Sequence, residues 1–166
     1  RIRVNMVAVP NDFHLLSKDI AAECSIKLRR EDTVKLKVLL FKNRTAMRRL
    51  VLNHLSESSL GRSCAGCVIR LGIYVESYKK GTTPVHSTIV DKNYYAVMGL
   101  VEPDISLDII AHESAHAALA YMARTYRSGR RWSREDDLAE EELAYPVGRL
   151  TALIHGWLVK EGVKVR

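Results

Sequence analysis

Two long helical patterns in the second half of the chain constrain the fold most strongly. Residues 106–126 contain no Pro or Gly, which predicts one long helix with Ser106 as its N-cap. A second helix is predicted over residues 133–160, with a kink at Pro146 because proline removes a helical hydrogen bond. Any fold of this chain therefore has to accommodate two long consecutive helices.

The first part of the chain alternates between strand and helix patterns. Apolar and polar residues alternate in four segments, which predicts strands over 2–8, 34–40, 67–75 and 94–101. Helical spacing predicts two shorter helices, over residues 14–24 and 44–55, and residues 56–65 have the composition of a loop. Strands mixed with helices, followed by two long helices, indicate an α+β fold with a mostly antiparallel sheet.

Length and composition predict one globular domain over residues 1–166, with an N-terminal part of strands and helices over 1–90. The longest apolar run spans seven residues, 117–123, whereas a membrane helix needs about 20. We therefore expect no membrane segment, and no secretory leader is visible. The three cysteines are too few for a disulfide scaffold and favour a reducing, cytoplasmic location.

The net charge of +7 is concentrated near the N-terminus. Residues 1–63 contain 13 Lys and Arg against 6 Asp and Glu, whereas residues 64–166 contain 13 of each kind. A basic half of this sort can indicate an anionic partner such as nucleic acid. A solvated basic face is the commoner explanation of such a pattern, and nucleic-acid binding is kept as the second hypothesis.

The predicted long helix contains the segment His112-Glu113-Ser114-Ala115-His116. Two histidines at i and i+4 project from one face of a helix, close enough to share a metal ion. A Glu next to the first histidine can take a proton from a metal-bound water. Because the flanking residues are small or apolar, we expect this face of the helix to be buried, which favours a metal as the partner of the histidines.

The motif at 112–116 resembles that of zincin metallopeptidases. No Gly or His follows within residues 117–126, so the metzincin branch does not fit. Three glutamates at 140–142 follow on the next helix and resemble the gluzincin arrangement, in which a downstream Glu is the third zinc ligand. Compact intracellular and phage-type zincins, including the ImmA/IrrE-like group, share this pattern. The resemblance covers residues 94–158, the half with the metal site.

This resemblance implies a Zn²⁺-dependent hydrolase that cleaves protein or peptide substrates, with Glu113 as general base. It also implies that an edge strand before the motif helix pairs with the substrate, which would be the strand ending near Val101. Among the glutamates, Glu141 shares a stripe with mostly apolar or small residues and is expected to face the core. Glu140 remains an alternative ligand, and Glu142 is placed on the solvent face beside Pro146.

Two further groups of residues have no single predicted role. The oxyanion of the reaction needs a second donor besides the metal, and the candidates are Tyr145, His86, Tyr94, Tyr95 and His155. The pair Cys64 and Cys67 has the spacing of a zinc knuckle but lacks a second pair, and Cys67 is expected to begin a strand that faces the core. The alternative function is that of a nucleic-acid-associated phage or mobile-element protein, in which the zinc is structural or DNA contact directs the peptidase.

Overall fold

The structure of the chain is a computed structural model that describes residues 18–54, 64–71, 92–125 and 137–166. Four strands are present in these ranges: β1 (Ile20–Ile26), β2 (Lys35–Phe41), β3 (Gly66–Arg70) and β4 (Tyr94–Val101). The helices are α1 (Arg44–His54), α2 (Leu107–Thr125) and α3 (Asp137–Lys160), and a short 3-10 helix, η2 (Glu102–Asp104), precedes α2. Helices packed on one mixed sheet confirm the predicted α+β class.

The four strands form one mixed sheet in the order β1-β2-β4-β3. The β1/β2 and β3/β4 pairs are antiparallel, and the central β2/β4 pair is parallel. Both central strands are buried over most of their length, as expected for strands covered on both faces. The prediction of a mostly antiparallel sheet is confirmed, with one parallel pair at its centre.

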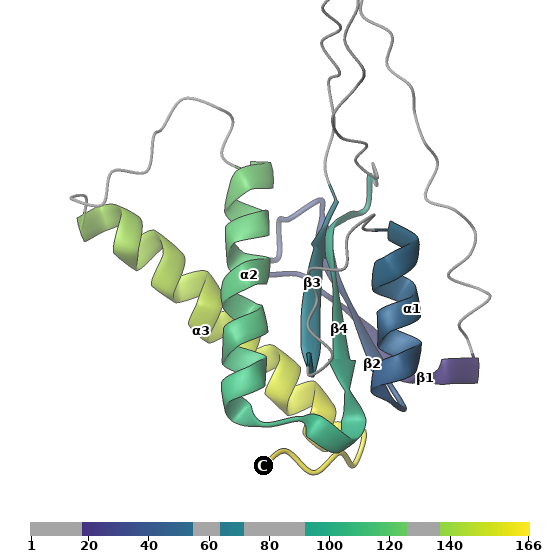
Figure 1. Cartoon of the computed structure of the whole chain (residues 1–166). Helices are drawn as coiled ribbons and strands as arrows, with labels where there is room; N and C mark the ends of the chain where they lie inside the picture. The colour runs from purple at the N-terminus through teal and green to yellow at the C-terminus, as the bar shows by residue number, and fades with distance from the viewer. Residues whose placement is uncertain (1–17, 55–63, 72–91, 126–136) are drawn as a thin grey trace, which may run out of the picture.

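Helices cover both faces of this sheet (Figure 1). The long helices α2 and α3 pack together on one face, around a core that includes Leu36, Met98 and Leu150. The shorter α1 lies on the opposite face, over a second core that includes Phe41 and Met47. The sheet therefore separates the motif helix α2 from the basic helix α1.

The start of α2 is fixed by local hydrogen bonds. Ser106 caps the helix as predicted, because its Oγ accepts a hydrogen bond from the Ile109 amide at 3.3 Å. The C-terminal residue Arg166 lies beside this turn: its carbonyl accepts from the Leu107 amide at 3.1 Å, and its amide donates to the Ile105 carbonyl at 3.2 Å. The first turn of the motif helix is thus tied to the end of the chain.

Most of the predicted elements that fall within the described ranges are confirmed, with one clear error. The helix expected over 14–24 is wrong, because Ile20–Ile26 is a strand whose inward residues alternate with exposed ones. Period-two alternation was the stronger signal there. The strand over 2–8 and parts of the segments 56–65, 67–75 and 133–160 lie outside the described residues. None of the helices in the described ranges combines the length and apolarity needed to cross a membrane.

The expected substrate-binding edge strand is also placed differently. The strand ending at Val101 is β4, which pairs with β2 on one side and with β3 on the other. It is therefore an interior strand, and the strand at the edge on this side of the described sheet is β3. Sequence order misleads here because β3 enters the sheet outside β4, although it precedes β4 in the chain.

Candidate metal centre

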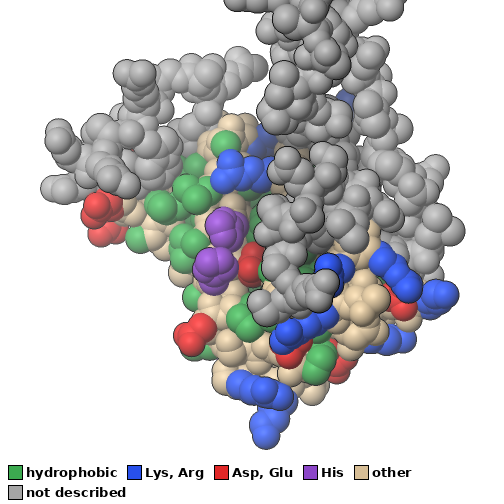
Figure 2. All heavy atoms as spheres, viewed as in Figure 1, with side chains coloured by type: hydrophobic (Ala, Val, Ile, Leu, Met, Phe, Trp, Pro, Cys, Tyr) green, Lys and Arg blue, Asp and Glu red, His purple; other side chains and the backbone are tan. Residues whose placement is uncertain are grey.

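The two motif histidines lie together on the outer face of α2. Both side chains are exposed, and Figure 2 shows two histidine side chains next to each other at the surface. The Nε2 atoms of His112 and His116 are 3.2 Å apart, with ring centroids 4.8 Å apart and the rings close to perpendicular. The i, i+4 spacing on one helix produces this approach.

This separation fits a pair of metal ligands. Zinc–nitrogen bonds measure about 2.0–2.1 Å, so two nitrogens at the corners of a tetrahedral site lie about 3.3–3.4 Å apart. The 3.2 Å between the two Nε2 atoms is close to that value. In the absence of a metal, one ring has to donate a hydrogen bond to the other across the same gap. The separation of the two nitrogens therefore suits either a hydrogen bond between the rings or two ligands of one metal ion.

The expectation that the whole motif is buried was wrong for the histidines and right for the glutamate. The apolar flanking residues Ile110 and Ala117 lie on the inner face of α2, together with Glu113. Residues 112 and 116 point the other way, on a face shared with the partly exposed Leu119. Apolar neighbours in sequence lie at other helical angles, so they say little about the face that the histidines occupy.

Glu113 occupies a tight position between α2 and the edge strand β3. Its side chain is only 5% exposed, and a Cβ added to Gly66 would lie 2.6 Å from its Cγ. Burial raises the pKa of the Glu113 carboxyl, an effect that the neighbouring His112 partly opposes. Its Oε2 has no hydrogen-bond partner among the residues that the structure describes. A buried carboxylate oxygen without a partner is costly, in line with the raised pKa of this carboxyl.

No third ligand is in place next to the histidines. Across 18–54, 64–71, 92–125 and 137–166, no group of three or more His, Cys, Asp or Glu side chains is arranged to hold a metal ion. Glu140 and Glu141 are exposed on α3, and Glu142 is half-buried. The two histidines are thus brought together, whereas Glu113 lies on the inner face of α2 and the predicted ligand Glu141 does not join the histidines in this arrangement.

The reasoning about the helical face of Glu141 was also wrong. Its stripe faces solvent, since Tyr145 is 57% exposed and Gly148 is exposed as well. The buried stripe of α3 passes instead through Pro146 and Leu150, so the side of the helix that Glu142 shares with Pro146 turns toward the protein rather than to solvent. A proline inside a helix was interpreted as a surface residue, but its apolar ring packs inward here.

The candidate oxyanion donors lie in different surroundings. Tyr95 is buried and its ring packs edge-on against Tyr121, while the Tyr94 hydroxyl lies 3.1 Å from Ser25 Oγ. Tyr145 lines a pocket with residues 28–31, His155 is half-buried on α3, and His86 lies outside the described residues. None of these observations selects a donor for the proposed reaction.

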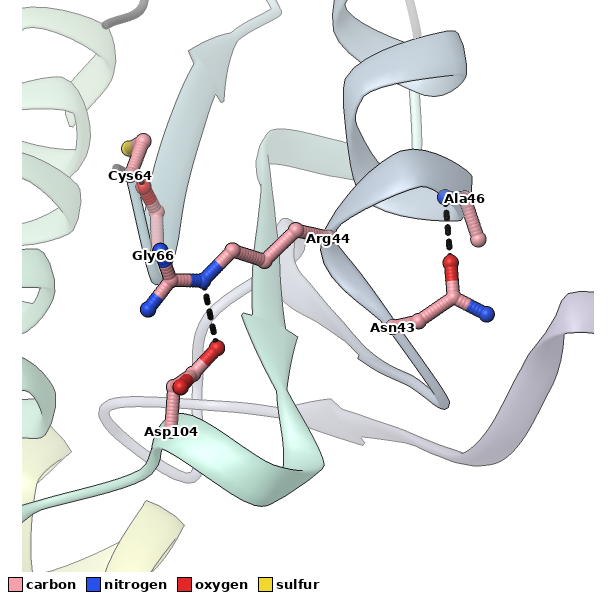
Figure 3. Close-up of polar contacts among 6 residues, drawn as sticks. All are labelled: Asn43, Arg44, Ala46, Cys64, Gly66 and Asp104. Atoms are coloured by element: carbon pink, nitrogen blue, oxygen red, sulfur yellow. Dashed lines mark hydrogen bonds and ion pairs between the residues drawn. The ribbon is translucent and has the colours of Figure 1, made fainter. Parts of the chain in front are cut away.

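The beginning of β3 lies beside an ion pair that the sequence did not reveal. Arg44, at the start of α1, extends past Cys64 and Gly66 and donates from Nε to Asp104 at 2.6 Å (Figure 3). The Cys64 thiol donates a hydrogen bond to the Gly66 carbonyl. Cys67 is buried as predicted, and burial raises the pKa of its thiol to about 12, so it stays protonated and unreactive at neutral pH.

Gly66 is the neighbour of Glu113 that sequence reasoning missed. A glycine at the start of an alternating strand pattern signals a close approach of another group, and this signal was present at position 66. Its partner could not be identified from the sequence, since residue 113 lies 47 positions later in the chain. The contact exists only because α2 packs against β3.

Several of the basic side chains near the N-terminus are engaged within the protein. Lys37 pairs with Glu23 at 2.7 Å, and Arg49 lies 3.7 Å from Asp19. Lys42 donates to the carbonyl of Lys18 at 2.9 Å, and Arg44 is held by Asp104. Internal pairing reduces the charge that this region offers to an anionic partner, and nucleic-acid binding stays a prediction.

Comparison with known proteins gave no match to a family model, to a curated protein or to a solved structure. Assignment of a function therefore depends on the chemistry of the residues themselves. Three of them carry it: the convergent pair His112 and His116, and the buried Glu113 beside the edge strand β3.

Proposed function

We propose that this chain is a zinc-dependent peptidase whose metal centre is built on α2. The observation that carries the proposal is the 3.2 Å approach of the two exposed Nε2 atoms of His112 and His116, immediately beside a buried glutamate. Bound zinc supplies a water of lowered pKa and polarises the substrate carbonyl. The proposed ligands are the imidazole rings of His112 and His116.

Glu113 is the proposed general base. Because burial raises the pKa of its carboxyl, the carboxylate binds a proton more readily than an exposed glutamate does. The Glu113 carboxylate would accept the proton of the attacking water and later pass it to the leaving amine. Packing against Gly66 limits the positions that the side chain can take, which holds it next to His112.

Glu141 is the proposed third ligand, with Glu140 as the alternative. Both side chains are exposed on α3, and α3 packs against α2. Metal binding by either residue requires the first turns of α3 to move toward the histidines. The Glu141→Gln and Glu140→Gln proteins should therefore differ in zinc affinity. The variant that binds zinc more weakly identifies the glutamate that is the ligand.

The proposed substrate is an extended peptide at the edge strand. Among the described strands β3 pairs only with β4, so its outer edge presents backbone groups to a partner. β3 also contacts α2 through Gly66 and Glu113. A peptide added along β3 would place a scissile bond near the motif helix. The proposed compartment is the cytoplasm, in keeping with three free thiols.

The proposal is tested by separating metal binding from chemistry. Glu113→Gln should retain zinc and the fold but lose hydrolysis of a mixed peptide library, measured by mass spectrometry of the products. Glu102→Gln is the matched control, because it makes the same change at an exposed glutamate of η2. Undiminished cleavage by the Glu113→Gln protein would refute the role of Glu113.

A further inference from the structure

A second candidate site lies away from the histidines. An open pocket of about 600 Å³ lies between the turn that follows β1 and the exposed side of α3. Its walls are formed by Leu28, Arg29, Arg30, Glu31, Tyr145 and Arg149. None of the three motif residues lines it, so it is separate from the proposed metal centre. Its volume lies in the range of pockets that bind small molecules.

The walls of this pocket carry an excess of positive charge. Three arginines face one glutamate, a formal balance of +2. Arg30 and Arg149 are exposed and come from different elements, one from the β1–β2 turn and one from α3. Guanidinium groups contributed by two different elements of one pocket suit a phosphate group, because each presents a planar set of donors to its oxygens.

The same pocket contains an exposed aromatic ring. Tyr145 is 57% exposed, although large aromatic side chains are usually buried over much of their surface. It lies one helical turn before Arg149 on α3, so ring and guanidinium share one face of the helix. An aromatic ring next to a cationic groove is the arrangement that proteins use to stack a nucleobase while holding its phosphate.

We propose that this pocket binds a nucleoside phosphate, with the phosphate held by Arg30 and Arg149 and the base stacked on Tyr145. Glu31 supplies an acceptor for a sugar hydroxyl or an amino group of the base. The nearly buried Leu28, 3% exposed, forms an apolar part of the wall. The ligand is either a free nucleotide or one unit of a single strand, since the two share this chemistry.

The turn that carries two of the arginines is held in place before any ligand binds. Asp32 Oδ2 accepts from the Arg29 amide at 2.8 Å, and the Asp32 amide donates to the Arg29 carbonyl at 3.2 Å. Asp32 Oδ1 accepts from the Tyr121 hydroxyl of α2 at 2.9 Å. A turn fixed in this way loses little further freedom on binding, which favours a preformed site.

Calorimetric titration of the full chain with AMP, adenosine and inorganic phosphate tests the proposal. AMP should bind more tightly than either fragment. Arg30→Ala and Arg149→Ala should each weaken AMP binding by about tenfold or more, since a charge-assisted contact is lost. Arg49→Ala removes the same charge from α1, on the other face of the sheet, and should leave the affinity unchanged.

Three further measurements define the ligand. Tyr145→Ala should weaken AMP binding without changing the affinity for inorganic phosphate. A further ligand to titrate is an oligonucleotide of eight thymidine nucleotides. If it binds more tightly than AMP and depends on Arg149 in the same way, the natural ligand is a single strand. Otherwise the natural ligand is a free nucleotide. His116→Ala should leave AMP binding unchanged. The proposal for the pocket and the proposal for the metal centre can therefore be refuted independently.

The proposal is overturned if AMP does not bind at millimolar concentration, or if both arginine variants bind it as the unaltered chain does. It is also overturned if AMP and inorganic phosphate bind with equal affinity and Tyr145→Ala leaves the affinity for AMP unchanged. The pocket would then hold phosphate without recognising a base.

Discussion

Replacement of Gly66 by alanine tests the packing that holds Glu113. A Cβ at position 66 would lie 2.6 Å from Glu113 Cγ and 2.9 Å from both its Cδ and Oε1. Contacts below 3.0 Å are not tolerated, so an atom has to move. Strand β3 is held by its pairing with β4, where Gly66 lies opposite Leu100. The Glu113 side chain is therefore the group that should be displaced.

The expected magnitude follows from two opposing effects. Overpacking of this kind costs about 1–3 kcal/mol. Gly66 does not have a positive φ, so alanine fits the backbone and gains about 0.4–1 kcal/mol by restricting the unfolded chain. The net expectation is a loss of about 1–2 kcal/mol in the free energy of unfolding. If Glu113 is first changed to Ala, the clashing atoms are gone and Gly66→Ala should instead stabilise.

Urea denaturation of a double-mutant cycle measures this reversal of sign. The four proteins are the unaltered chain, Gly66→Ala, Glu113→Ala and the double variant. Gly148→Ala is the matched control: nothing lies within 4 Å of its added Cβ, so it should stabilise α3 by about 0.5–1 kcal/mol in either background. Equal effects of Gly66→Ala in both backgrounds would refute the proposed packing of Glu113.

Two further predictions concern charged groups. The Arg44 hydrogen bond holds the pKa of Asp104 below its ordinary value of 3.8, so the pair stabilises the fold above that pH. Asp104→Asn should therefore lower the thermal midpoint at pH 7, and its difference from the unaltered chain should shrink as the pH falls below about 3.8. Nucleic-acid binding through the basic half should be weak and unspecific at 150 mM salt, in gel-shift titrations, and a tight sequence-selective complex would contradict this. Substitution of four basic residues by Glu should abolish the residual nucleic-acid binding and leave the zinc content unchanged. These residues are Lys35, Lys42, Arg44 and Arg48.

Much of the fold was predictable because local patterns and tertiary packing agree in this chain. The alternation over 34–40 and the unbroken helical pattern over 106–126 correspond to β2 and α2. The β1 segment was predicted as a helix, although Ala22 and Cys24 alternate with exposed residues. Strand order was beyond the sequence, since nothing local shows that β3 joins the sheet outside β4.

The candidate site was predictable only where the geometry of one helix determines it. The spacing of His112 and His116 is set by the helix itself, and so is their 3.2 Å approach. Burial depends on what packs against each face: it was predicted correctly for Glu113 and Cys67 but wrongly for the histidines and for Glu141. The contact of Glu113 with Gly66 depends on tertiary packing in the same way.

Zinc content of the purified protein tests the central claim most directly. After dialysis against dilute zinc and then against metal-free buffer, elemental analysis should find about one zinc per chain. His112→Ala and His116→Ala should each abolish zinc binding, because each removes one of the two imidazole ligands. His155→Ala, which changes a half-buried histidine of α3, should keep the metal. Full zinc occupancy in the His116→Ala protein would contradict a metal centre on α2.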